Sequence, residues 1–210
     1  IGSARVLLPD ALRKTLHSFW VDAVFCPSNP SGGFANESKD MILQNIMWAD
    51  GVLLAGDLGR NSETAILLED IVRSTNSTIA ITKDALDYFT TMPDILLQRE
   101  HTIIVGSFAQ IQKMLSSAHQ PHAITYSMQL FQLITILNSV TEAMRCTIVT
   151  TFAEKCIVSH AGNVSTTVMA PNEKTWRLDV ASRAVVAALH ARGNVFKAVT
   201  HSVYRHELHS

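Results

Sequence analysis

Short apolar runs alternate along most of the chain with longer stretches in which apolar residues recur at helical spacing. The runs have the length of buried strands, are rich in β-branched residues and are bounded by turn or capping residues. They predict strands at residues 4–8, 23–26, 52–55, 78–81, 102–105, 147–151, 156–160 and 164–169. The amphipathic stretches predict helices at residues 9–20, 38–47, 63–73, 84–88, 107–115, 127–143, 176–191 and 195–207.

This order of elements predicts the fold class. Strand-helix steps of this kind are typical of a mainly parallel sheet with helices on both faces, and the turn at Gly162-Asn163 predicts an antiparallel hairpin at one edge. In such sheets ligands bind beyond the carboxyl ends of the strands. That rule places three segments on one rim of the sheet: Gly56–Gly59, Lys83–Asp84 and Gly106–Ser107.

The stretch from Trp48 to Thr64 is the most informative part of that rim. A buried strand runs into a turn at Gly56 and Gly59, and Asn61 or Ser62 can then cap a helix. Backbone N–H groups at the start of a helix attract phosphate, and glycine lets a ligand approach the backbone closely. The stretch therefore indicates an anion site, although an ordinary strand-helix turn with a helix cap has the same pattern.

Composition narrows the classes of protein that remain. The chain has 210 residues, so we expect one large domain or at most two small ones. Because 47% of the residues are hydrophobic and only 17% are charged, we expect either that much of the chain is buried or that a partner subunit covers part of its surface. A formal charge of -1 gives no general attraction to nucleic acid or to acidic membranes. The weakly charged run at 126–141 contains polar residues and is too short to span a bilayer, so we expect a buried helix and no membrane association.

Cysteine and histidine spacing predicts no metal site. The three cysteines are irregularly spaced, which favours reduced thiols in a cytoplasmic protein over a disulfide framework or a zinc site. The nine histidines form no pattern of metal ligands at helical spacing.

Several segments occur in the order of a known family. A G-P-G-L-G-R turn is matched by Gly56-Asp57-Leu58-Gly59-Arg60, and a strand ending D-A-D-A-L by residues 81–86. The strands that end T-P-H-P-G-E-F and V-V-L-K-G correspond to residues 103–108 and 147–152, and a G-T-G-D-V-L-A-G helix start corresponds to residues 176–182. The chain thus resembles the ribokinase-like fold, and specifically the ADP/ATP-dependent NAD(P)H-hydrate dehydratases.

This resemblance implies a single three-layer α/β/α domain over residues 1–210, with the family's first strand-helix unit absent or placed before Ile1. It implies Asp179 as the catalytic acid/base and a homo-oligomeric assembly. The ligands that it implies are ADP or ATP with Mg²⁺ and a small-molecule substrate. Nucleotide phosphates would be bound by Arg177 and Ser182, and the substrate by Gly56, Asp57, Gly59, Arg60 and Asp84.

The resemblance leaves three functions open. The first is a lyase that repairs hydrated nicotinamide nucleotides, and the second is a small-molecule kinase that transfers a γ-phosphoryl group to a sugar or vitamin hydroxyl. A carboxylate such as Asp179 suits proton transfer in either reaction, but Asp179 and Asp84 are equally ordinary residues at helix starts. The third is an inactive binding or assembly protein, because Trp176, Arg177 and Leu178 stand in place of G-T-G, whose small residues let phosphate approach the backbone.

Overall fold

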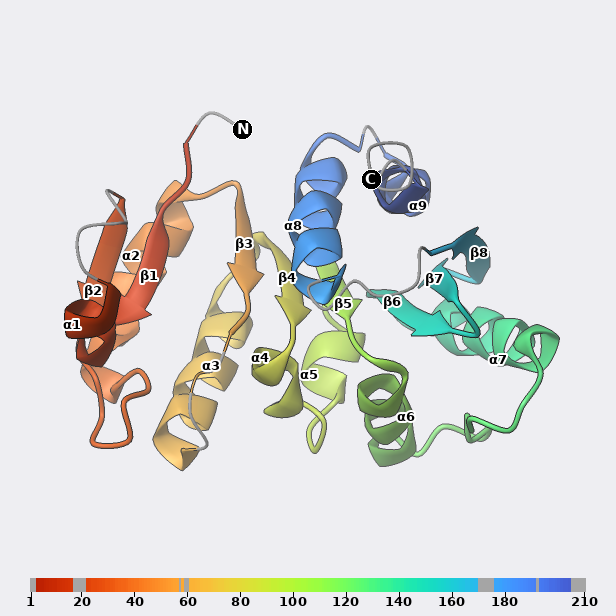
Figure 1. Ribbon diagram of the computed structural model, residues 1–210, viewed down its shortest axis with the longest axis horizontal. Helices are drawn as coiled ribbons and strands as arrows, with labels where there is room; N and C mark the ends of the chain where they lie inside the picture. Colours follow the sequence, from red (N-terminus) through yellow and green to blue (C-terminus); the bar gives the residue numbers. More distant parts are fainter. Residues whose placement is uncertain are drawn as a thin grey trace. The chain divides into compact units, whose positions relative to one another are not determined.

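A computed structural model describes residues 3–16, 22–56, 58, 61–169, 176–191 and 193–204 (Figure 1). The chain divides into two compact units. The first unit comprises Ile1–Asp50 and Asp57–Ser77, and the second comprises Gly51–Gly56 and Thr78–Ser210.

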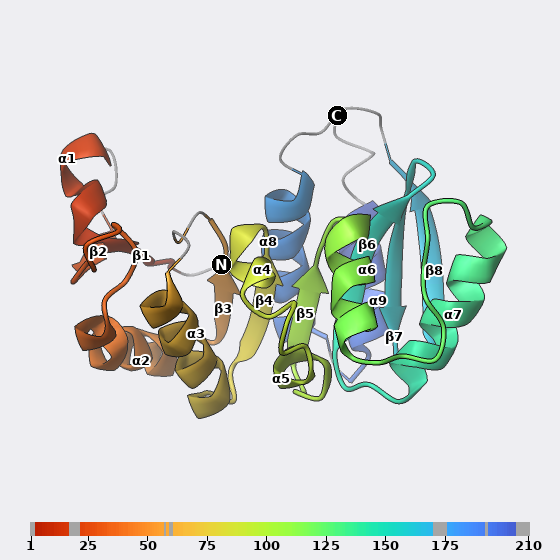
Figure 2. The same ribbon diagram turned by 90° about the horizontal axis from the view of Figure 1, so that it is seen from below.

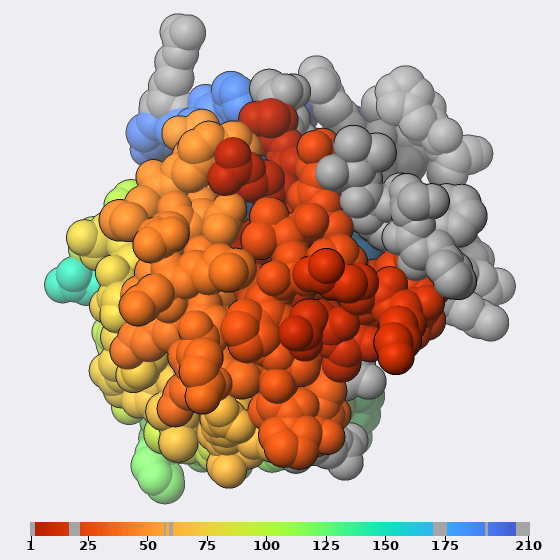
Figure 3. Space-filling view, turned by 90° about the vertical axis from the view of Figure 1, so that its left-hand side faces the viewer, coloured from red at the N-terminus to blue at the C-terminus, as the bar shows by residue number. Residues whose placement is uncertain are grey.

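The first unit is built around a two-stranded parallel sheet in which Val6 pairs with Ala23 and Pro9 with Cys26. Its elements are β1 (Val6–Pro9), η1 (Asp10–Leu12), α1 (Arg13–Leu16), β2 (Ala23–Cys26), η3 (Asn36–Ser38), α2 (Lys39–Trp48) and α3 (Ser62–Ser74). Figure 3 shows the surface of this unit, coloured red to orange. The segment before β1 is tied to α2, because Arg5 donates to Asn45 at 3.1 Å and its guanidinium lies 4.2 Å from the centroid of the Trp48 ring.

The second unit contains a six-stranded sheet in the order β3-β4-β5-β6-β7-β8. Its strands are β3 (Gly51–Leu54), β4 (Thr78–Thr82), β5 (Thr102–Val105), β6 (Thr147–Phe152), β7 (Lys155–His160) and β8 (Asn163–Val168). The first four run parallel, and β6, β7 and β8 form two successive antiparallel hairpins. The carboxyl ends of β3 to β6 therefore share one edge of the sheet.

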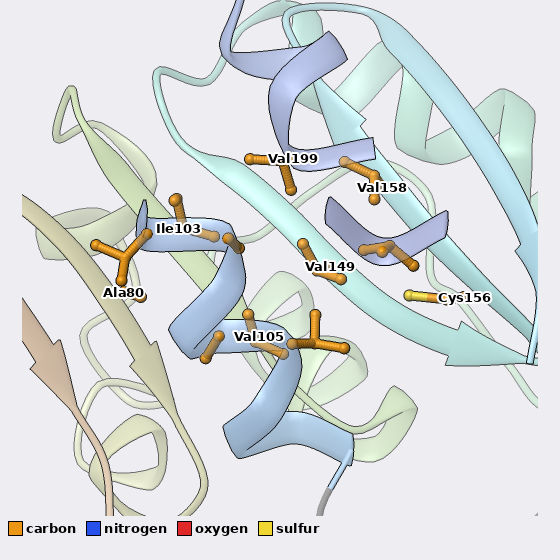
Figure 4. Packing of buried hydrophobic residues seen from close by; sticks show 12 residues of the cluster. Ala80, Ile103, Val105, Val149, Cys156, Val158 and Val199 are labelled. Atoms are coloured by element: carbon orange, nitrogen blue, oxygen red, sulfur yellow. The ribbon is translucent and has the colours of Figure 1, made fainter. Parts of the chain in front are cut away.

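Helices cover both faces of this sheet (Figures 1 and 2). They are α4 (Asp84–Asp87), α5 (Asp94–Leu97), α6 (Phe108–Ser117), α7 (Leu130–Glu142), α8 (Trp176–Leu189) and α9 (Val195–Tyr204). Valine and alanine side chains of α8 and α9 pack on one face of β4 to β7 and form an apolar cluster there (Figure 4). On the other face α6 and α7 pack on β6 and β7, where the Ser159 hydroxyl donates to the carbonyl of Leu137.

The predicted fold class is confirmed: the sheet is mainly parallel, ends in an antiparallel hairpin and has helices on both faces. One expectation needs correction, because the first two strands pair with each other in a small separate sheet. The α5 helix was not predicted, because Asp94–Leu97 is too short to show a helical repeat. Of the helix predicted at 9–20, residues 10–16 form η1 and α1, and residues 17–20 lie outside the described residues, as do 205–207 of the last predicted helix.

Candidate functional site

Two tight turns shape the carboxyl edge of the six-stranded sheet. After β4, Lys83 has a φ of 53° and a ψ of −137°, a conformation that glycine adopts more readily, and α4 begins at the next residue. After β5, Gly106 donates its N–H to the Val149 carbonyl, and a Cβ atom there would lie 2.8 Å from side-chain atoms of Leu86 and Ile111. The close approach at Gly106 lets α6 begin directly above the strand end.

Gln110 joins these turns. Its side chain forms a capping box with Ser107 at the start of α6. The amide nitrogen Nε2 donates to the Lys83 carbonyl at 3.0 Å and to Asp87 Oδ1 at 2.7 Å. The amide oxygen Oε1 accepts from Nη1 of Arg177 at 2.9 Å. One side chain therefore connects the starts of α4, α6 and α8 at the edge where this class of sheet binds ligands.

The position of Arg177 follows from the pattern of α8. Ala181 and Ala184 belong to the buried stripe that packs on the sheet, and Arg177 lies one turn before Ala181 on that stripe. Its side chain can therefore extend past the strand ends to Gln110. Trp176 packs against the apolar cluster beneath α8, whereas Leu178 is exposed.

Asp179 faces a different neighbour. Its Oδ2 accepts a hydrogen bond from Nη2 of Arg183 at 2.5 Å, and Nη1 of Arg183 donates to the Ser202 carbonyl in α9. Residues two apart on a helix point to different sides, so the Asp179 carboxylate and the Arg177 guanidinium do not converge. The Ser182 hydroxyl donates to the Asp179 carbonyl at 2.8 Å, so this hydrogen bond lies within α8.

Of the remaining predicted site residues, the structure describes Gly56 and Asp84. Gly56 has a φ of 104°, and no atom of the described residues beyond its two chain neighbours lies within 4 Å of the place where a Cβ atom would stand, as expected for a turn that a ligand can approach. Asp84 is exposed in the first turn of α4, next to the Lys83 carbonyl that Gln110 binds. Asp57, Gly59 and Arg60 lie outside the described residues.

Within the first unit, the long loop after β2 is fixed to the start of α3. The buried side chain of Asn29 accepts from Gly33 N and donates to the Phe34 carbonyl and to Thr64 Oγ1, each at 3.1 Å. Asn61 accepts from the backbone N–H of Glu63 at 2.7 Å and so caps α3, as the sequence predicts. The capping side chain occupies one of the N–H groups that an anion would otherwise use.

The sequence gives one partial signal for Gln110, which was not predicted as a site residue. Ser107 followed three residues later by glutamine is a capping-box pattern and marks a helix start. Its other partners cannot be read from sequence, because Arg177 lies 67 positions away along the chain.

Neither a metal-ligating cluster nor a membrane-spanning helix occurs among the described residues. Nowhere among them do three or more His, Cys, Asp or Glu side chains gather in a way that could hold a metal ion. None of the helices in the described ranges has the length and apolar character needed to cross a membrane.

Solved structures resemble this chain at low sequence identity. A hypothetical protein from Streptococcus mutans matches with a TM-score of 0.67 and 13% identity, over 99% of this chain and 71% of its own. A ribokinase-like superfamily protein from Enterococcus faecalis V583 matches with a TM-score of 0.69 and 16% identity, over 97% of this chain and 66% of its own. No family model matches the sequence, and no curated protein sequence is significantly similar to it.

The protein therefore has a ribokinase-like α/β fold. The chain spans only 71% and 66% of the length of these two neighbours.

Proposed function

We propose that this chain binds an adenine nucleotide at the carboxyl edge of its six-stranded sheet and acts as an NAD(P)H-hydrate dehydratase-like protein. The observation that carries the proposal is the Arg177 guanidinium, which Gln110 holds at the start of α8. A guanidinium presents a planar fork of donors that matches phosphate oxygens. In this chain an arginine side chain would replace the glycine backbone that binds phosphate in the family motif.

Arg177 and the start of α8 offer positive charge to the phosphates of ADP or ATP, at an edge that also carries the exposed carboxylates of Asp84 and Asp87. The start of a helix carries a partial positive charge, so α8 and Arg177 would attract the same anion. A nucleotide-bound Mg²⁺ takes most of its ligands from phosphate and water and needs one or two carboxylates. Asp84, an exposed carboxylate at the start of α4, would contribute such a ligand.

In the dehydratase reaction Asp179 would donate a proton to the hydroxyl of the hydrated nicotinamide ring, which leaves as water. The carboxylate so formed would take the proton that the neighbouring ring carbon loses as the double bond forms. The substrate would contact the turns at Gly56 and Asp84. Arg177 would hold the nucleotide phosphates, and a bound Mg²⁺ would neutralise part of their charge.

A binding protein without turnover is the second candidate. The observation that favours it is the pairing of Asp179 with Arg183, on a side of α8 that Arg177 does not share. A carboxylate held there would have to change rotamer before it could reach a substrate bound at Arg177.

Isothermal titration of the protein with ADP, ATP and AMP in the presence of Mg²⁺ tests the proposal. We expect micromolar binding of ADP or ATP, and a loss of about tenfold or more in affinity in Arg177→Met, because a charged hydrogen bond to phosphate is removed. Arg145→Met is the matched control. Arg145 forms an ion pair with Glu100 just before β6, at the amino end of that strand, whereas the proposed site lies at the carboxyl ends of the strands. The proposal fails if no nucleotide binds at millimolar concentration.

An assay of product formation then distinguishes an enzyme from a protein that only binds the nucleotide. The lyase would be established if the wild type consumes hydrated NADH and the Asp179→Asn variant does not, while the variant keeps its affinity for the nucleotide. A phosphorylated sugar or vitamin would instead indicate a kinase, and binding without any product would establish the second candidate.

A further inference from the structure

We infer that Gln110 is a positioning residue, which holds the guanidinium of Arg177 in the orientation that receives phosphate. The inference rests on the nucleotide site proposed above and adds to it a residue outside the resemblance to the dehydratases. It follows from the contacts of one amide group with three elements of the second unit.

The orientation of this amide is fixed by its partners. Oε1 accepts from Nη1 of Arg177 at 2.9 Å and from the backbone N–H of Ser107 at 3.1 Å. Nε2 donates to the Lys83 carbonyl at 3.0 Å and to Asp87 Oδ1 at 2.7 Å. A reversed amide would face donors with its nitrogen and acceptors with its oxygen, so only one orientation satisfies the network.

An amide held in this way restricts the arginine that it contacts. An arginine side chain has many rotamers in solution, and fixing it before the ligand arrives lowers the entropy lost on binding. Within the described ranges, Gln110 takes one of the five N–H donors of Arg177, and a guanidinium can offer the others to a phosphate. Gln110 therefore acts on phosphate affinity through Arg177.

A double-mutant cycle measures this dependence. Dissociation constants for ADP with Mg²⁺ are compared in the wild type, Gln110→Met, Arg177→Met and the double variant. Methionine has a length similar to that of glutamine but makes none of the hydrogen bonds of its amide group. We expect Gln110→Met to weaken binding about fivefold or more, and to have no further effect once Arg177 is replaced. Additive losses, or an unchanged affinity in Gln110→Met, would overturn the inference.

Gln112→Met is the matched control for the integrity of α6. Gln112 lies on the same helix, and its Nε2 donates to the Ile124 carbonyl at 2.6 Å, so its replacement also removes a glutamine hydrogen bond. We expect this variant to bind ADP within about twofold of the wild type. An equal loss of affinity in both glutamine variants would show that Gln110 serves the helix alone, which contradicts a positioning role.

A measurement without nucleotide separates this inference from the proposed function. Side-chain ¹⁵N NMR reports how freely an arginine guanidinium rotates, and a hydrogen-bonded guanidinium rotates slowly. We expect the Arg177 signal to show restricted rotation in the wild type and free rotation in Gln110→Met. If that difference is seen but ADP does not bind, Gln110 still fixes the Arg177 guanidinium, and it is the proposed nucleotide function that falls. Free rotation in both proteins would overturn the positioning role.

Discussion

Asp179 and Arg183, one turn apart on α8, form an ion pair whose nitrogen and oxygen atoms are 2.5 Å apart. The carboxylate that the sequence resemblance offers as the catalytic acid/base is thereby engaged within its own helix, while Arg177 faces Gln110. The two predicted site residues lie on one helical turn but contact different neighbours. The catalytic role of Asp179 stays a prediction, whose test depends on separating this pairing from chemistry.

The first prediction concerns the contribution of that pair to stability. Both side chains are partly exposed, at 29% and 42%, so solvent screens the attraction and Asp179→Asn should lower the free energy of unfolding by about 0.5 kcal/mol or less. Urea unfolding measures the change. The matched control is Glu69→Gln, which removes the same kind of pair with Arg73 in α3. A loss of several kcal/mol in Asp179→Asn alone would assign the carboxylate a structural role.

The second prediction concerns the strained turn after β4. Lys83 has a φ of 53°, which costs a residue with a Cβ atom about 1–3 kcal/mol, and glycine avoids that cost. Lys83→Gly should therefore raise the free energy of unfolding by about 1 kcal/mol after the added chain entropy is subtracted. Lys83→Ala keeps the strain and serves as the control. Equal stability of the two variants would contradict the strain.

The third prediction compares two glycines at positions where other atoms lie too close for an added Cβ atom. A Cβ atom at Gly33 would lie 2.5 Å from the backbone oxygen of Leu58, whereas at Gly106 it would meet the movable side-chain ends of Leu86 and Ile111 at 2.8 Å. Gly33→Ala should destabilise the protein by about 3 kcal/mol and Gly106→Ala by about 1 kcal/mol. Urea unfolding of both variants tests the order, and the reverse order would refute the account.

The fourth prediction is a pH dependence that comes from a buried thiol. Burial raises the pKa of Cys146 from 9.0 to about 12 in the folded protein. Above about pH 9 the unfolded thiol loses its proton while the folded one keeps it, so the free energy of unfolding falls with rising pH, by at most about 1.4 kcal/mol per pH unit. The loss ends near the folded pKa of about 12.

Comparison with a variant isolates this thiol from the lysines and tyrosines that titrate in the same range. The free energy of unfolding of Cys146→Ala should fall less steeply than that of the wild type between about pH 8 and pH 10. Parallel curves for the two proteins would show that the thiol is not shielded in the folded state.

The sequence by itself determined most of the elements and the class of fold. Strands such as Thr102–Val105 are continuous apolar runs with turn residues at both ends, so local pattern and final burial agree. The cap at Asn61 and the capping box at Ser107 depend on residues two or three positions away, which a single sequence shows.

Only the tertiary structure decided which strands pair and which side chains meet at the edge of the sheet. No local pattern separates the pair β1 and β2 from the strands of the main sheet, because strand partners are chosen by packing over long sequence distances. Nor can helical spacing near Asp179 show that Arg177 contacts Gln110 while Asp179 contacts Arg183. The side a residue faces depends on how α8 sits on the sheet, and that follows from the packing of the whole apolar cluster.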